Sequence, residues 1–126
     1  MAARVQLISA GQFVEGVASG GMHRSDAISA ATCGATGIFS VLSRIAPGGR
    51  GSAHVHTNCE SSIYVVSGRG RMLTGDGLEL ELPMAPGTFL FVPPGAPHLP
   101  INDGDAELVL VVSRNAAEEI VEDYRE

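Results

Sequence analysis

The chain has 126 residues, of which 44% are hydrophobic and 17% charged, so length and composition fit one globular domain and not a disordered chain. Its net charge of -6 argues against a nucleic-acid partner, because such proteins neutralise phosphates with a basic face. All eight basic residues are arginine, and the lack of lysine excludes Schiff-base chemistry and a Walker-type phosphate loop.

The sequence carries no signal for a membrane. It has no apolar run near the roughly 18 residues that a membrane-spanning helix needs. The first residues, "MAARVQLISAGQF", lack the apolar core and small-residue cleavage site of a signal peptide. We therefore expect a cytoplasmic protein, in which Cys33 and Cys59 are thiols.

Short strands joined by turns dominate the predicted elements. In chain order, hydrophobic alternation and β-branched residues predict strands at 5–9, 37–45, 53–56 and 62–68, a hairpin over 71–82, and strands at 88–92, 98–101 and 106–114. Residues 10–35 have weak periodicity and fit a loop, a short helical turn around "RSDAI" or an irregular lid. Only 115–124 has a helical pattern, and its acidic composition equally fits a solvated tail.

Eight or nine strands at near-regular spacing predict a β-sandwich or a small barrel. There is no internal repeat and no linker, so residues 1–126 are expected to form a single domain.

Three histidines and one glutamate are the candidate metal ligands. In "HVH" the side chains of His54 and His56 share one strand face, and Glu60 can return to that face after the turn "TNC". Alone, such a pair is more often simply solvated. His98 changes this, because it brings a third imidazole to a strand end after a proline-rich turn. Three nitrogens and one oxygen suit a divalent transition metal.

Two spaced motifs in the chain resemble those of the cupin superfamily. The stretch "GGRGSAHVHTNCESSIYVVSG" follows the first cupin motif, with its closing glycine, Gly68, one residue late. The stretch "GTFLFVPPGAPHLPIN" meets the second motif at every fixed position, namely Gly87, Pro93, Gly95, His98 and Asn102. Together the motifs cover residues 48–102, and the flanking strands are compatible with the same family.

The resemblance implies an all-β, double-stranded β-helix (an RmlC-like jelly-roll barrel) with its core at about 36–114 and a short helical or acidic C-terminal tail. It implies one divalent metal ion, of Fe, Mn, Ni, Co or Zn, held in the barrel mouth by His54, His56, Glu60 and His98. It also implies a homodimer, in which a strand such as 5–9 adds to the partner's sheet and covers an exposed edge.

The leading functional hypothesis is a metal-dependent enzyme acting on a small organic molecule, with dioxygenase-type chemistry favoured. Isomerase or lyase chemistry with another metal is the alternative, as is a non-catalytic small-molecule binder or sensor, since one fold hosts many functions. A metal-free, sugar-epimerase-like protein is a further alternative, weakened by the complete ligand set. A general base is hard to nominate: apart from the proposed ligands, only Tyr64 and His23 are candidates, and Tyr64 is a weak one.

Several other residues have two interpretations. His23 fits either a lid over the barrel mouth or an exposed surface position, and Cys59 fits either a reactive thiol or a small turn residue. Asn102 is expected to order the turn after His98. Three arginines can hold a ligand carboxylate or phosphate if they turn inward, and the sequence leaves their direction open; these are Arg44, Arg69 and Arg71.

Overall fold

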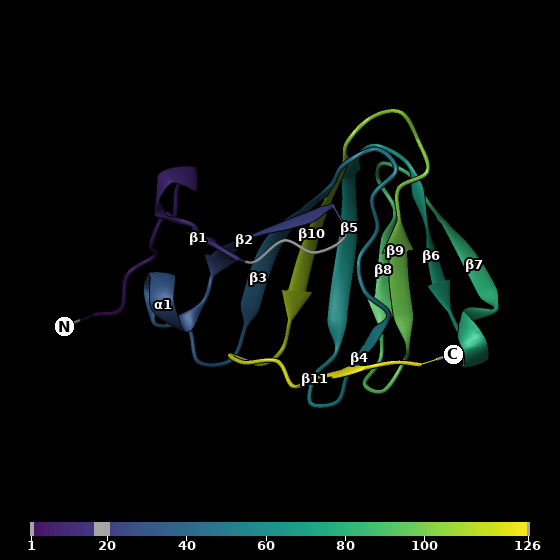
Figure 1. Cartoon of the computed structure of the whole chain (residues 1–126). Coiled ribbons are helices and arrows are strands. Elements are labelled where there is room, and N and C mark those ends of the chain that lie inside the picture. Colours follow the sequence, from purple (N-terminus) through teal and green to yellow (C-terminus); the bar gives the residue numbers. More distant parts are fainter. Residues whose placement is uncertain (1, 17–20, 126) are drawn as a thin grey trace.

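Two antiparallel sheets face each other in the computed structural model, which describes residues 2–16 and 21–125 (Figure 1). The first sheet has the order β1 (Val14–Glu15), β2 (Met22–Ile28), β3 (Phe39–Ile45), β10 (Leu108–Arg114), β5 (Ser61–Ser67) and β8 (Phe89–Val92). The second has the order β11 (Val121–Asp123), β4 (His54–His56), β9 (His98–Ile101), β6 (Gly70–Thr74) and β7 (Leu80–Met84). The predicted jelly roll is confirmed.

Helical structure is confined to three short pieces of the described chain: α1 (Ala30–Cys33) and the 3-10 turns η1 (Ala10–Gln12) and η2 (Asp76–Leu78). Within residues 2–16 and 21–125, no helix has the length and apolar character needed to cross a bilayer.

The core lies between the sheets, and strand alternation builds it. Every second residue of β3, from Phe39 to Ile45, is buried, as expected for a strand with one face toward the core. The buried cluster consists of Ile45, Ile63, Val65, Met72, Met84, Val92, Leu108, Leu110 and Val112. Burial of a large apolar side chain stabilises the fold by about 1.5–3 kcal/mol relative to exposure. This core fixes the relative positions of the strands in the two sheets.

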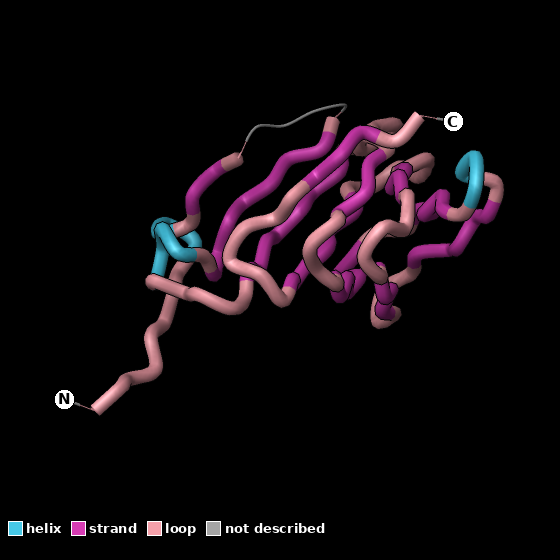
Figure 2. The backbone as a smooth tube through the Cα atoms, turned by 90° about the horizontal axis from the view of Figure 1, so that it is seen from below, coloured by secondary structure: helices cyan, strands magenta, loops and turns pink. Residues whose placement is uncertain are grey.

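The N-terminal region differs from the prediction. Residues 5–9 form no strand, and Val5 and Leu7 are exposed on a segment that extends away from the sheets (Figure 2). None of the three alternatives given for residues 10–35 included a strand, yet "RSDAI" lies in β2 and pairs in antiparallel fashion with β3. A single helical turn follows at α1, where the Ser29 hydroxyl accepts a hydrogen bond from the Thr32 backbone amide.

The C-terminal segment is acidic, as predicted, but its described part contains a strand and no helix. β11 pairs with β4, with Val121 opposite His56 and Asp123 opposite His54. The Asn58 side chain fixes this course: its amide donates to the Glu118 carbonyl at 2.7 Å, and its oxygen accepts from the Ile120 amide at 2.7 Å. Pairing with the free edge of β4 thus overrides the weak helical pattern.

Candidate metal centre

Three histidines from neighbouring strands converge at one end of the space between the sheets. His54 and His56 lie on β4, and His98 begins β9 directly opposite His54. One nitrogen of each ring lies within 4.8 Å of one nitrogen of the other two, and the Nε2 atoms of His54 and His56 are 3.1 Å apart. The three histidines are thus positioned to bind one metal ion.

The other ring nitrogen of each histidine faces an acceptor. Nδ1 of His54 lies 2.6 Å from the Ser52 carbonyl, and Nδ1 of His98 lies 3.0 Å from the Ala96 carbonyl. A carbonyl oxygen can only accept, so both Nδ1 atoms must carry the hydrogen. Their Nε2 atoms therefore present lone pairs, which is the orientation that a metal ligand requires.

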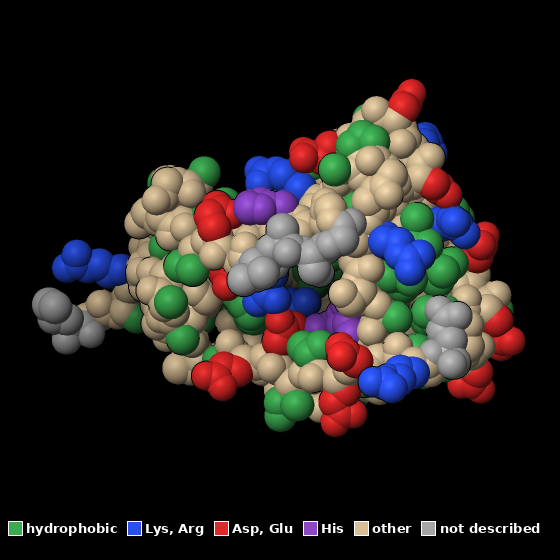
Figure 3. Space-filling model, viewed as in Figure 1, with side chains coloured by type: hydrophobic (Ala, Val, Ile, Leu, Met, Phe, Trp, Pro, Cys, Tyr) green, Lys and Arg blue, Asp and Glu red, His purple; other side chains and the backbone are tan. Residues whose placement is uncertain are grey.

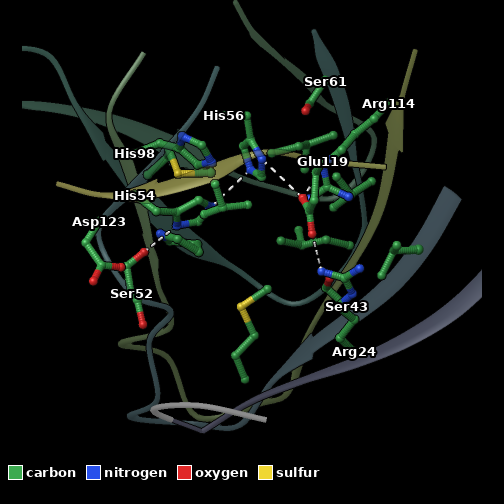
Figure 4. Close-up of a pocket in the computed structure, with 18 residues that line it drawn as sticks. Arg24, Ser43, Ser52, His54, His56, Ser61, His98, Arg114, Glu119 and Asp123 are labelled. Atoms are coloured by element: carbon green, nitrogen blue, oxygen red, sulfur yellow. Dashed lines mark hydrogen bonds and ion pairs between the residues drawn. The ribbon is translucent and has the colours of Figure 1, made fainter. Parts of the chain in front are cut away.

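His56 is oriented by a carboxylate instead of a carbonyl. Its Nδ1 lies 3.1 Å from Oε2 of Glu119, a charge contact without good hydrogen-bond geometry, and its Nε2 is turned toward Nε2 of His54 (Figure 4). Carboxylate–histidine pairs of this kind commonly fix the rings of metal ligands. The donor set therefore fits a divalent transition metal by chemistry as well as by position.

The electrostatic environment keeps two of these imidazoles neutral. Burial, together with the Coulombic effect of His54, lowers the pKa of His98 to about 4. Burial also lowers the pKa of His54, and nearby His56 adds to this effect. Both rings are therefore unprotonated near pH 7, the form in which histidine binds metal.

Glu60, the fourth predicted ligand, does not join the three histidines in the structure. Its side chain is exposed, and only its backbone amide is engaged, donating to Oδ1 of Asn115 at 2.8 Å. The reason is the phase of β5, in which Ser61, Ile63 and Val65 are buried and face the core. Glu60 precedes this set by one residue, so strand alternation turns it outward.

Ser61 takes the inward position. Its side chain is buried, it lines the pocket beside the histidines, and its hydroxyl has no hydrogen-bond partner among the residues that the structure describes. The position of Gly68 in the sequence already indicates this. The first motif places six residues between its glutamate and its closing glycine, and Gly68 has this spacing from Ser61 and not from Glu60. Gly68 is fixed in place, since it has φ of +81° and a Cβ there would lie 2.3 Å from the Glu107 carbonyl oxygen.

The histidines line a pocket of about 300 Å³ that also contains charged groups from both ends of the chain. Figure 3 shows histidine, basic and acidic side chains gathered in a hollow of one face. Arg24 comes from β2, Arg114 ends β10, and Glu119 lies in the segment that leads to β11. None of these three was a predicted site residue. Arg114 extends the β10 pattern, but nothing in its spacing indicates a site.

Other candidate residues lie outside the pocket. Tyr64 packs against Phe89 on the opposite face of the first sheet, with ring centroids 4.8 Å apart. His23 is exposed and pairs with Glu15 at 2.7 Å. Cys59 is buried as a free thiol. These positions do not bring the three side chains to the histidines.

The three arginines singled out from the sequence also do not line this pocket. Arg71 pairs with Glu81 and Asp103, at 2.6 and 2.7 Å, and Arg69 is exposed. Arg44 is near Glu107, at 3.9 Å.

Asn102 orders its turn as predicted. It is fully buried and donates to the carbonyls of Ile45 and Ala106, both at 2.8 Å, while accepting from the Gly104 amide at 3.0 Å. The turn that follows β9 is thereby tied to the end of β3.

Comparison with known proteins decides the family. The Cupin domain family matches residues 41–114, more than half of the chain, and that range contains all three histidines. The chain belongs to the cupin family. A curated relative, the glucose-6-phosphate isomerase of Thermococcus onnurineus (strain NA1), is 33% identical over 64 residues, which are 49% of this cupin and 34% of that protein. This cupin therefore spans about a third of the length of that relative.

Solved structures show the same fold. The oxalate decarboxylase OxdC of Bacillus subtilis is 26% identical and superposes with a TM-score of 0.75, covering 85% of this cupin and 29% of the longer enzyme chain. The polyketide cyclase RemF of Streptomyces resistomycificus has a TM-score of 0.81 at 20% identity, over 98% of this cupin and 87% of that chain. An uncharacterised protein of Klebsiella pneumoniae matches over 98% of this cupin and 100% of its own chain, with a TM-score of 0.77 and 19% identity.

Proposed function

We propose that this cupin binds one divalent transition metal ion through Nε2 of His54, His56 and His98 and uses it to act on a small organic molecule. The observation that carries this proposal is the convergence of three Nε2 atoms whose partner nitrogens all face acceptors. Three protein ligands leave about three positions free if the metal is six-coordinate, which is enough for a bidentate ligand. When bound, the metal supplies Lewis-acid and template chemistry.

Two reaction classes follow from this arrangement. Oxygenase-type chemistry is favoured because Glu119, one of the two carboxylates that line the described pocket, is already engaged by Arg24, Arg114 and His56, which suits reactions centred on the metal. Isomerase chemistry is the second candidate, and the 33% identity to a glucose-6-phosphate isomerase over 64 residues supports it. Manganese is the first metal to test, since the 26%-identical oxalate decarboxylase has Mn(II) centres.

Metal loading tests the proposal. We expect protein that is stripped with a chelator and reloaded with Mn(II), Fe(II), Co(II), Ni(II) or Zn(II) to retain about one equivalent of at least one metal after desalting, measured by elemental analysis. The same metal should raise the free energy of unfolding, by about 2.7 kcal/mol at a free concentration of 100 Kd. Less than about a tenth of an equivalent of every metal, with no stabilisation, would exclude a metal-dependent function.

We also propose that the protein is a homodimer formed through the outer face of the first sheet. An apolar patch there consists of Tyr64, Val66, Phe89, Phe91 and Val111, with Tyr64 opposite both Phe89 and Val111 in the strand register. Phe89 and Phe91 are 70% and 66% exposed, which is unusual for aromatic side chains on a monomer surface. A second copy with the same patch would cover it in a two-fold interface.

Light scattering on size-exclusion fractions tests the dimer. We expect a mass of about twice 13.0 kDa for the wild type and a shift to monomer for a Phe89→Ser, Phe91→Ser variant. The matched control is Val5→Ser, Leu7→Ser, which changes two exposed apolar residues away from the patch. Dissociation by this control alone would instead assign the contact to the N-terminal segment, and a monomeric wild type would remove the proposal.

A further inference from the structure

Arg114 is a buried cation inside the pocket, and its partners do not satisfy it. The side chain is 9% exposed, and its Nε lies 3.0 Å from Oε2 of Glu119. Nε and Nη1 have no hydrogen bond of acceptable geometry with any residue that the structure describes. A buried donor without a partner costs about 1–3 kcal/mol, and more when charged. An arginine held in this way is suited to an incoming oxygen ligand.

Arg24 brings a second guanidinium to the same place. Its Nη1 donates to Oε1 of Glu119 at 2.5 Å, and its Nε donates to Asp26 at 2.9 Å. The guanidinium carbons of Arg24 and Arg114 lie 5.0 and 5.7 Å from the centroid of the Phe39 ring. Both arginines are thus held against one aromatic side chain and directed at one carboxylate.

Glu119 is one carboxylate that contacts two arginines and one histidine. Its two oxygens contact Arg24, Arg114 and His56, and it lies between them in the pocket (Figure 4). A divalent metal on three neutral imidazoles would keep its full charge of +2, because Ser61 stands at the inward position of β5 where a carboxylate ligand would lower it. Asp123 also lines the pocket and Asp26 pairs with Arg24, but with a divalent metal bound the positive charges would still exceed the negative ones.

The segment that carries Glu119 leads into a short, exposed strand at a sheet edge. β11 is three residues long, all three residues are exposed, and it pairs with β4 at the edge of the second sheet. Its other bonds include the two to the Asn58 side chain, which are exposed to solvent, and the donation from the Thr57 amide to the Ile120 carbonyl at 3.0 Å. Short, exposed edge segments with little buried surface open at low free-energy cost.

We propose that the pocket binds a small organic carboxylate, which replaces Glu119 on Arg114 and Arg24. Glu119 is then an internal stand-in for the ligand, and the segment 115–123 is a strap that closes over the empty pocket. The paired guanidinium groups recognise the ligand carboxylate through the bidentate contacts that arginine makes with planar anions. The position of the rest of the ligand near the histidines rests on the proposed metal centre, whereas its arginine contacts do not. The volume of about 300 Å³ suits a molecule of only a few carbons.

Isothermal titration with acetate, malonate and succinate tests this proposal, with malonamide as the uncharged analogue and inorganic phosphate as the competing anion. Each titration uses metal-saturated and metal-stripped protein in parallel. We expect at least one carboxylate to bind the wild type, and malonamide not to bind. Arg114→Gln should weaken that binding at least tenfold. Glu119→Gln should tighten it several-fold, because the internal competitor loses its charge but keeps its shape.

Two further variants keep the test decisive. Arg44→Gln is the matched control, since Arg44 lies outside the pocket and should leave binding unchanged. Arg114→Lys keeps the charge without the planar fork and serves if Arg114→Gln does not fold, as judged by circular dichroism. It should bind more weakly than the wild type.

Opposite results would overturn the proposal: no carboxylate binds, malonamide or phosphate alone binds, or the Arg114 variants bind like the wild type. The stripped-protein titrations separate this outcome from failure of the metal centre. If elemental analysis shows no metal in any sample, the proposed function fails, while the dependence on Arg114 and Glu119 still decides the carboxylate site.

Discussion

Replacing His98 with alanine is expected to abolish metal retention. His98 is buried, stands opposite His54 in the sheet register, and supplies one of the three imidazoles that converge in the described part of the chain. Changing groups that merely orient a metal ligand commonly costs 10–100-fold in affinity, so removing a ligand should cost at least about a hundredfold. Elemental analysis after desalting, and competition with a fluorescent chelator, measure the change.

The control for this experiment is His23→Ala. His23 is an exposed histidine that pairs with Glu15 and does not line the pocket, so its loss should leave the metal content unchanged. Unfolding of both variants in the presence of a chelator shows whether the fold survives without metal. Full occupancy in His98→Ala, with the fold intact, would show that the three-histidine assignment is mistaken.

Ser61→Glu is expected to have the opposite effect and to tighten metal binding by a factor on the order of ten or more. Ser61 is buried, faces the pocket from β5 and has a hydroxyl without a partner among the described residues. A carboxylate at this position adds an oxygen ligand and a negative charge to three neutral nitrogens, which strengthens binding of a divalent cation. Without metal, the buried charge should lower the free energy of unfolding by about 1–3 kcal/mol.

Glu60→Gln is the matched comparison, because it changes a carboxylate one residue away on the outward side of the chain. We expect no change in metal affinity. Thermal unfolding with and without metal, measured for both variants, should show a widened gap for Ser61→Glu and an unaltered one for Glu60→Gln. Loss of metal from Glu60→Gln would restore Glu60 as a ligand and show that β5 shifts by one residue when metal binds.

The sequence was sufficient for most of the fold because alternation and turn residues agree along its middle part. The strand predicted at 98–101 matches β9 residue for residue, and the segment 37–45 contains β3. The "HVH" pair and the histidine after the proline-rich turn also predicted three imidazoles at neighbouring strand ends, and in the structure His98 lies opposite His54. These are local signals: the two-residue alternation of side chains and the glycine and proline residues at the turns predict the same strand boundaries.

The remaining parts depended on contacts that spacing does not reveal. The direction of Glu60 is decided by one residue of strand phase, which the buried set of β5 and the position of Gly68 determine together. The segment 115–124 has a helical pattern, but a free strand edge and two bonds to Asn58 make it extended. Arg24 and Glu119 are 95 residues apart in the chain and meet only after both sheets have formed.

The distribution of the site along the chain has a consequence for how this cupin can diverge. All three histidines lie within residues 41–114, the part that matches the family, whereas Arg24 and Glu119 lie before and after it. The strands that carry the three histidines and Arg114 are thus encoded in one contiguous stretch, whereas Arg24 and the carboxylate of Glu119 come from the two flanks. Because Glu119 contacts both His56 and Arg114, a change in the C-terminal flank also alters the charge beside the histidines. Replacing the flanks alone would therefore change what faces Arg114 while leaving Arg114 and the three histidines in the sequence.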